Sequence, residues 1–460
     1  KTMEKQKLVL GLAPTRRDTR DFPLHFAHKR KAAVEAMVRD IAATYRVEVV
    51  NIDFLNDEGL LIYPEDAPKV AAHFQEYHVD AVMVPHVNFG AEEAVAILGK
   101  LVGKPLLLWG PRDEAPPPSG PRQTDTQCGL FATGMVLNRY RVPFTYLENC
   151  WLDDKKFSDG LIRFFRTASV VKAFRGLRIG QISVRPRTFL TVKVNENQLL
   201  ERFGIEIVTI DYTEMAAEIQ RMLREKPTSM REIQAALLQN YDTAQMEPEA
   251  VEKLAAMEAA ILGLAEKYGL TCLASECWRT FSVPFGIMPC AGFADLTERG
   301  LPVACECDIH GAISSCLLAA ASQWEQATFL ADMTIRHPTN DNAELLWHCG
   351  PCPVSMSKQG SVPRMEQCLG QFPLERGDVT VCRFGETEGE YKLFIGEGRS
   401  VEGPETNGNY LWLETCDWPQ WEEKLVKGPY IHHISVAFGT WGSVLREACG
   451  YLGIAPDMAP

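Results

Sequence analysis

The sequence predicts an α/β protein with two doubly wound parallel-sheet domains followed by a β-rich C-terminal domain. Apolar runs of strand length alternate with helical stretches through the first two thirds of the chain, an order that typically builds a parallel sheet covered by helices. Beyond about Thr334, short β-like runs divided by Gly and Pro take over. The 460 residues exceed what one core organises, so about three domains of roughly 150 residues are expected.

The first domain is predicted over residues 1–115. Strands and helices alternate at residues 7–13, 29–45, 48–52, 66–77, 81–85, 92–101 and 105–109. The stretch 113–122, with the sequence DEAPPPSGPR, contains four prolines, which remove hydrogen-bond donors and fix φ. Because this stretch can continue neither a helix nor a central strand, a domain boundary is placed there.

The second domain is predicted over residues 116–333 and the third over residues 334–460. In the second domain, the patterns predict helices and strands at residues 128–140, 158–174, 177–182, 206–210 and 248–268. In the third, residues 380–384 and 391–397 are predicted strands. The second domain is therefore expected to be α/β and the third β-rich.

The composition excludes some classes of partner. The 47 basic and 60 acidic residues give a net charge of −13, which repels a phosphate backbone, so no nucleic-acid partner is expected. No apolar run approaches the roughly 20 residues that span a bilayer, and residues 1–7 lack the apolar stretch of a signal peptide. No membrane partner and a cytoplasmic location are therefore predicted. The 14 cysteines are scattered through a large chain and are expected to be reduced thiols, mostly buried.

Histidines and acids of the last third form the candidate site. Five of the ten histidines lie after residue 300, together with Glu306 in PVACECD (302–308) and Asp332 in ATFLADM (327–333). An unpaired charge in such an apolar run costs several kcal/mol to bury, so each acid needs a partner. A divalent cation would stabilise both carboxylates, and imidazole nitrogens would complete its shell. Helix capping or an ion pair is the alternative, and capping is favoured for Asp308, which directly precedes the helical run 309–321.

Four segments resemble the L-fucose isomerase and L-arabinose isomerase superfamily. They are ACECDIHG (304–311), LADMTIR (330–336), LLWHCGPCPV (345–354) and the pair His432-His433. The resemblance implies a metal centre of Glu306, Asp332, His348 and one histidine of the pair, with His433 preferred. In the fucose type fewer histidines bind the metal, which leaves His348 as an alternative substrate contact. The implied ion is Mn²⁺, or another divalent cation such as Co²⁺ or Mg²⁺.

The reaction that this resemblance implies is aldose–ketose isomerisation of a monosaccharide, by proton transfer between C1 and C2. A metal on O1 and O2 would polarise the carbonyl, one carboxylate would carry the carbon-bound proton, and a second group would move a proton between the oxygens. Glu306 and Asp332 are the predicted catalytic residues. The resemblance also implies a homo-oligomer, often a hexamer, with sites near subunit boundaries.

Substrate contacts are predicted at three places. The segment SECWRTF (275–281) resembles a family loop that lines the sugar, which suggests Trp278 and Arg279, and His432 is expected to orient the metal or touch the sugar. Two arginine pairs follow predicted strands at the sheet edge where doubly wound domains bind ligands, namely Arg16, Arg17, Arg185 and Arg187. Four arginines suit a sulfonate or phosphate better than a neutral sugar, so isomerisation of sulfoquinovose to sulfofructose is the alternative. The default explanation for these four arginines is that they are ordinary solvent-exposed side chains.

The sequence also allows other functional interpretations. Cys349 and Cys352 have the spacing of a thioredoxin-type redox pair, but they precede Pro353 late in a large chain instead of opening a helix after an early strand. A structural zinc site would use these two together with Cys305 and Cys307, whose spacing is tighter than usual. A non-catalytic sugar-binding protein built of two α/β lobes is the alternative from a different class.

Overall fold

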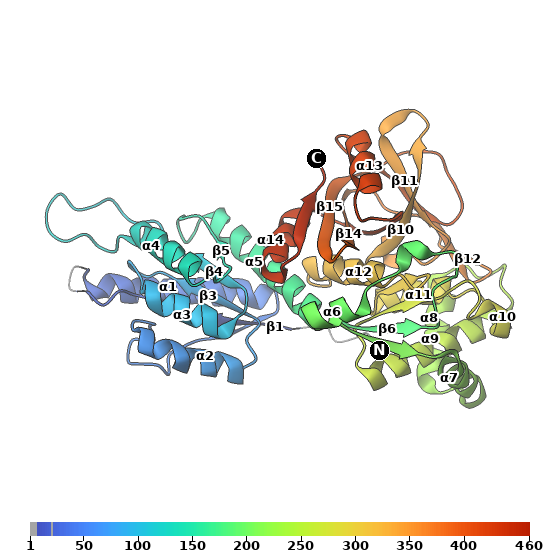
Figure 1. The fold of residues 1–460 in the computed structure, drawn as a ribbon, viewed down its shortest axis with the longest axis horizontal. Helices are drawn as coiled ribbons and strands as arrows, with labels where there is room; N and C mark the ends of the chain where they lie inside the picture. Colours follow the sequence, from blue (N-terminus) through green and yellow to red (C-terminus); the bar gives the residue numbers. More distant parts are fainter. Residues whose placement is uncertain (1–6, 20–21) are drawn as a thin grey trace. The chain divides into compact units, whose positions relative to one another are not determined.

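The structure is a computed structural model that describes residues 7–19 and 22–460 (Figure 1). The chain divides into two compact units. One runs to Lys172 and takes in residues 450–452, and the other consists of Ala173–Cys449 and Gly453–Pro460. Both units contain a parallel sheet, and the second also contains a largely antiparallel β-domain, so the predicted fold class is confirmed.

The N-terminal unit is a doubly wound sheet of five parallel strands in the order β2-β1-β3-β4-β5. The strands are β1 (Leu8–Leu12), β2 (Val47–Val50), β3 (Ala81–Pro85), β4 (Leu106–Trp109) and β5 (Thr145–Tyr146). The helices are α1 (Leu24–Thr44), α2 (Ala67–Glu76), α3 (Glu92–Val102), α4 (Thr126–Arg139) and α5 (Lys155–Arg175). One apolar core joins the sheet to α2, α3 and α4, and another joins it to α1 and α5. Because β5 pairs with β4, this sheet continues past the predicted boundary at residue 115.

The central domain contains a second parallel sheet, in the order β7-β6-β8-β9. Its strands are β6 (Arg178–Ile182), β7 (Glu206–Ile210), β8 (Cys272–Ser275) and β9 (Val303–Cys305). Its helices are α6 (Glu196–Phe203), α7 (Tyr212–Glu225), α8 (Thr228–Asn240), α9 (Pro248–Tyr268), α10 (Ser282–Phe285), α11 (Cys290–Glu298) and α12 (Ile309–Ala321). Helix α9 begins on a proline and ends before Gly269 in the left-handed conformation, which explains why its predicted bounds match.

The C-terminal β-domain closes into a barrel. Its strands are β10 (Phe329–His337), β11 (Asn340–His348), β12 (Arg364–Glu366), β13 (Leu369–Pro373), β14 (Asp378–Thr387), β15 (Glu390–Val401), β16 (Asn409–Glu414), β17 (His433–Phe438) and β18 (Ala455–Met458), with helices α13 (Trp418–Lys427) and α14 (Gly442–Leu452). The strand order β16-β11-β10-β17-β14-β15 is completed by pairing of β15 with β16, which makes a closed ring. Closure leaves no free edge along most of these strands.

Helix α12 joins the parallel sheet to the barrel. Every one of its residues is buried, and its sequence IHGAISSCLLAAA is accordingly apolar or small on all sides, apart from His310. It contacts β8 and β9 of the sheet and β14 and β17 of the barrel. The turn that precedes α12 is therefore held against both layers, and this turn carries Glu306 and Asp308.

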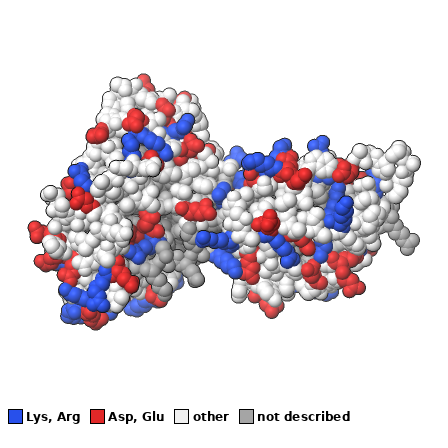
Figure 2. Space-filling model, turned by 180° about the vertical axis from the view of Figure 1, so that it is seen from behind, with Lys and Arg blue, Asp and Glu red and all other residues white. Residues whose placement is uncertain are grey.

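One face of the molecule carries mixed charge (Figure 2). On the face shown in Figure 2, acidic and basic side chains are interspersed over both units. Among the described residues, no helix is long and apolar enough to cross a membrane.

Candidate functional site

The four predicted metal ligands come from four segments around one end of the barrel. Glu306 lies in the turn between β9 and α12, Asp332 lies on β10, and His348 ends β11. His433 begins β17, where it is the direct cross-strand partner of Asp332. Because β10 pairs with β11 on its other edge, the barrel register brings Asp332, His348 and His433 to neighbouring strands.

Glu306 is held in an unusual backbone conformation. It and Cys307 have φ angles of 63° and 57°, in the left-handed region that non-glycine residues rarely adopt. Such positions cost about 1–3 kcal/mol each and persist where the surroundings determine them, which is common at functional sites. The side chain of Glu306 is 12% exposed. The tight turn thus directs a nearly buried carboxylate toward the barrel strands.

The distances show that these side chains converge. His433 Nε2 lies 2.9 Å from Glu306 Oε2, although without the alignment of a hydrogen bond, and 3.4 Å from Asp332 Oδ1. Ligand atoms of Glu306, His348 and His433 lie within 4.8 Å of one another, and so do those of Asp332, His432 and His433. Buried polar atoms are normally hydrogen-bonded, yet Asp332 Oδ1, His348 Nε2 and His433 Nε2 have no hydrogen-bond partner. Such oxygen and imidazole donors fit a divalent cation.

The electrostatics of the cluster also favour a positive charge. Burial disfavours an imidazolium, but the Asp308 and Glu306 carboxylates outweigh it and raise the pKa of His433 to about 9. Burial would raise the pKa of Glu306, but its contacts with His433 prevail and lower that pKa below the ordinary value. A metal-binding histidine is neutral, so a bound cation would take the place of this proton.

Asp308 does more than the helix capping that was predicted for it. Its Oδ1 accepts a hydrogen bond from the backbone N–H of Gly311 at 3.0 Å, so the cap is confirmed. The same carboxylate also contacts His433 Nδ1 at 2.8 Å and the guanidinium of Arg383 on β14. Arg383 was not among the predicted site residues, although it is a charge inside the largely apolar run VTVCRF, the same signal that predicts a partner for Glu306.

An aromatic surface borders the cluster. Trp278 is 43% exposed, and its indole N–H donates to Glu306 Oε1 at 2.9 Å. Phe189 packs edge-on against Trp278 and His432, with ring centroids 5.2 and 5.8 Å apart. Arg279 is exposed beside Trp278, and the buried Glu276 accepts hydrogen bonds from the backbone N–H groups of both. The sequence predicts no role for Phe189 or Glu276, because nothing in their local sequence distinguishes them from ordinary loop residues.

Comparison with known proteins identifies the family. Residues 11–175 match the model of the fucose/sulfoquinovose isomerase N-terminal domain, and residues 371–459 match that of the L-fucose isomerase C-terminal domain. The chain belongs to the fucose isomerase family. It is therefore an enzyme of the aldose–ketose isomerase class, as the resemblance predicted.

Curated relatives of this family member extend the match through most of the chain. The sulfoquinovose isomerase of Alkalicoccus urumqiensis is 28% identical over 338 residues, which cover 71% of this chain and 73% of that protein. The sulfoquinovose isomerase of Priestia aryabhattai is 26% identical over 334 residues, covering 70% and 72%. Among solved structures, an ABC transporter solute-binding protein from Actinobacillus succinogenes with bound D-allose aligns over 70% of this chain and 93% of its own at 11% identity. Its TM-score of 0.18 is too low to bear on the fold.

The four predicted arginines of this isomerase differ in their surroundings. Arg185 and Arg187 lie on the loop after β6 that also carries Phe189, and Arg187 is exposed. Arg16 and Arg17 belong to the N-terminal unit. The guanidinium of Arg16 is buried and bound to Glu58, with Nε 2.8 Å from Oε2, so it is already paired with a carboxylate. That of Arg17 lies over the Phe89 ring, 3.9 Å from its centroid.

The cysteines do not assemble the competing sites. The Sγ of Cys349 lies 3.6 Å from that of Cys290, whereas Cys352 Sγ contacts Met356. Neither candidate metal group found among residues 7–19 and 22–460 includes a cysteine. All 14 cysteines of the isomerase are free thiols, and most are buried.

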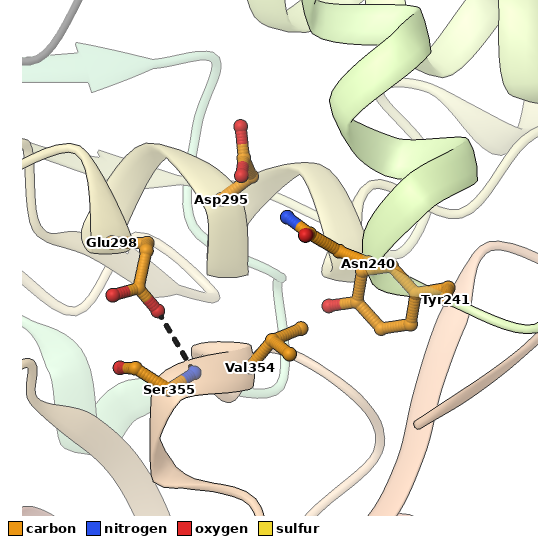
Figure 3. A pocket seen from close by; sticks show the side chains of 6 residues that line it. All are labelled: Asn240, Tyr241, Asp295, Glu298, Val354 and Ser355. Carbon is orange, nitrogen blue, oxygen red and sulfur yellow. Dashed lines mark hydrogen bonds between the residues drawn. The ribbon is translucent and has the colours of Figure 1, made fainter. Parts of the chain in front are cut away.

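An acidic cavity elsewhere in the same unit shares no residue with the cluster. It has a volume of about 220 Å³ and is lined by Asn240, Tyr241, Asp295, Glu298, Val354 and Ser355 (Figure 3). Glu298 accepts a hydrogen bond from the backbone N–H of Ser355 at 3.1 Å, and Asp295 pairs with Arg299. Because its carboxylates have these partners and no histidine lines it, the cavity lacks the donor set of the Glu306 cluster.

Proposed function

We propose that this protein isomerises sulfoquinovose to sulfofructose with a divalent cation bound by Glu306, Asp332, His433 and His348. The observation that carries the metal is that Asp332 Oδ1, His348 Nε2 and His433 Nε2 are buried without hydrogen-bond partners, in two groups of potential ligands that share His433. Mixed carboxylate and imidazole donors suit Mn²⁺, and Co²⁺ or Mg²⁺ are the alternative ions. The substrate is supported by the relatives, because both described above are sulfoquinovose isomerases.

The proposed mechanism needs two proton transfers, one between C1 and C2 and one between O1 and O2. A divalent cation held by these residues would supply polarisation of the sugar carbonyl, which would make the neighbouring C–H acidic. We assign the two transfers to Glu306 and Asp332, because their carboxylates face the cluster. The Trp278 N–H holds Oε1 of Glu306, which keeps Oε2 directed toward the cluster. Asp332 keeps Oδ1 without a hydrogen bond and is thus able to accept a proton.

The sugar itself would pack against the aromatic surface. Trp278 and Phe189 present ring faces and edges beside Glu306, and aromatic rings suit the apolar face of a sugar. His432 is 43% exposed in its side chain and contacts Phe189, so it is placed to bind a hydroxyl. We assign Trp278, Arg279 and His432 to sugar contacts.

The sulfonate would bind arginines on the adjoining loop. Phe189 reaches the cluster, and Arg185 and Arg187 precede it by a few residues, so this loop is the best-supported anion site. A guanidinium pairs with a sulfonate through parallel hydrogen bonds. Arg16 and Arg17 lie on a different loop, the one after β1, and their support is the resemblance alone: in that family the corresponding loop completes a neighbouring subunit's site. We accordingly propose a homo-oligomer, with a hexamer as the expected form.

A second candidate is isomerisation of a neutral deoxy sugar, which the match to the L-fucose isomerase C-terminal domain favours. Both are tested by incubating the purified protein with sulfoquinovose or L-fucose in heavy water and following C2 deuteration and ketose formation by NMR. We expect exchange with sulfoquinovose that stops on chelation and returns with Mn²⁺.

The other outcomes separate the parts of the proposal. Exchange with L-fucose but not with sulfoquinovose would show that the substrate is a neutral deoxy sugar. Full activity after exhaustive chelation would show that the reaction does not depend on a metal. Metal content gives an independent check. About one Mn²⁺ per chain supports the cluster, whereas zinc retained through thiols supports a cysteine site.

A further inference from the structure

Both ring nitrogens of His433 have defined surroundings. The side chain is completely buried, and Nδ1 lies 2.8 Å from Asp308 Oδ2 while Nε2 points to Glu306 and Asp332. An ionised carboxylate only accepts hydrogen bonds, so Nδ1 must carry the proton in this contact. A neutral His433 then has its lone pair on Nε2, which is the form that binds a metal through this atom.

Two further residues fix the Asp308 carboxylate. Its carboxylate receives the Gly311 N–H at the start of α12, and both terminal nitrogens of Arg383 contact it, with Nη2 2.9 Å from Oδ1. A Cβ at Gly311 would lie 2.4 Å from Asp308 Oδ2, so glycine permits this close approach. The arginine is 2% exposed and the aspartate 0%. A guanidinium that contacts both carboxylate oxygens in this way is the partner of an ionised aspartate.

We propose that Asp308 and Arg383 are positioning residues that lock His433 in the orientation and tautomer with Nε2 directed at the metal site. A buried ion pair is weak evidence for stability, since desolvation offsets its attraction. Here the pair has an additional partner on a third element, because Arg383 comes from β14, Asp308 from the start of α12 and His433 from β17. The arrangement therefore ties the ligand's ring angle to both layers of the fold. This inference rests on the proposed function, because it concerns the same metal site.

The test compares two buried aspartates that each pair with an arginine. Asp308→Asn keeps the shape but loses the charge that orients His433. Asp295→Asn is the matched control, because Asp295 is 8% exposed, pairs with Arg299 and shares no contact with the cluster. Mn²⁺ affinity is measured by calorimetry, together with the thermal midpoint of each metal-free protein. We expect Asp308→Asn to weaken Mn²⁺ binding about 10- to 100-fold, as loss of outer-shell partners does, and Asp295→Asn to leave it unchanged.

Arg383→Lys keeps the experiment informative if Asp308→Asn does not fold. It retains a positive charge but loses the planar fork, and we expect a several-fold loss of Mn²⁺ affinity. A purely structural pair would lower the thermal midpoint of Asp308→Asn and Asp295→Asn alike and leave Mn²⁺ affinity within twofold of the native protein, which would overturn the inference. If the native protein bound no Mn²⁺, Co²⁺ or Mg²⁺, the proposed metal site would fail first, and the inference with it.

Discussion

Asp332 and His433 are direct cross-strand partners, with Oδ1 and Nε2 3.4 Å apart. Side chains opposite one another in an antiparallel pair start from Cβ atoms about 4.5–5.5 Å apart, so backbone pairing alone places this carboxylate beside this imidazole. On its other edge, β10 pairs Asp332 with Trp347, which immediately precedes His348. Three of the proposed ligands are thus held by barrel hydrogen bonds, whereas Glu306 comes from a strained turn.

Replacing Glu306 by glutamine tests the carboxylate that the turn presents. The amide keeps the size of the side chain and can still accept the Trp278 N–H, so the fold should survive. It can neither shuttle a proton nor supply a negative ligand, and we expect turnover to fall at least about a hundredfold. Ketose formation and the circular dichroism spectrum are the two measurements. Near-normal turnover in a folded variant would place the reaction elsewhere.

The two adjacent histidines should differ in their effect on metal binding. His433 is buried with Nε2 facing Glu306 and Asp332, whereas His432 is half-exposed and lies beside Phe189. His433→Ala should therefore weaken Mn²⁺ binding by about a hundredfold or more. For His432→Ala we expect a much smaller loss and a raised KM for the sugar. The reverse ranking in a metal titration would exchange the two assignments and leave the proposed reaction intact.

Residues with a strong local signal could be predicted from the sequence. Glu306 and Asp332 stand out because a charge in an apolar run needs a partner, and the capping role of Asp308 follows from its place before a helix. Arg383 gives the same signal in VTVCRF, yet which acid it would meet depends on packing of β14 against α12. Phe189 gives no such local signal, because its contact with His432 forms only when the loop after β6 packs against the C-terminal β-domain.

The domain boundary shows the same limit. The four prolines of residues 113–122 do interrupt regular structure, as predicted. They form a loop within the N-terminal unit, however, because β5 returns to pair with β4 after them. A strand of two residues, Thr145–Tyr146, is too short to be recognised by alternation of apolar and polar residues. The prolines indicate that regular structure is interrupted, but only the pairing of β5 with β4, which are far apart in the sequence, decides where the domain ends.

The buried Glu344 on β11 lies outside the metal cluster and should make the folding stability of the protein depend on pH. Burial, reinforced by Glu422, raises the pKa of its carboxyl from 4.5 to about 7, and Arg336 only partly offsets this. The pKa of Glu344 is higher in the folded protein than in the unfolded chain. The protonated carboxyl therefore contributes to folding stability fully below about pH 4.5, and this contribution is lost as the pH rises through 7. Glu344→Gln should therefore raise the thermal midpoint by about 2–4 °C at pH 8 and change it little at pH 5.

The control for Glu344 is Glu325→Gln, an exposed glutamate of the same unit. Its thermal midpoint should differ from that of the native protein by the same small amount at both pH values. An equal gain for Glu344→Gln at pH 5 and pH 8 would show that packing of the amide, and not relief of a buried charge, is responsible.

The arginines of the loop after β6 test the substrate. Loss of a guanidinium that pairs with a sulfonate commonly costs about 1.5–3 kcal/mol, and about 1.4 kcal/mol is a factor of ten. Arg187→Ala should therefore lower kcat/KM for sulfoquinovose roughly tenfold or more, with little effect on a neutral sugar. Arg17→Ala should act in the same direction if its loop completes a neighbouring site. Arg364→Ala, an exposed arginine on β12, is the matched control and should change neither. Equal losses on sulfonated and neutral sugars would contradict an anionic substrate, because a purely structural defect does not discriminate by charge.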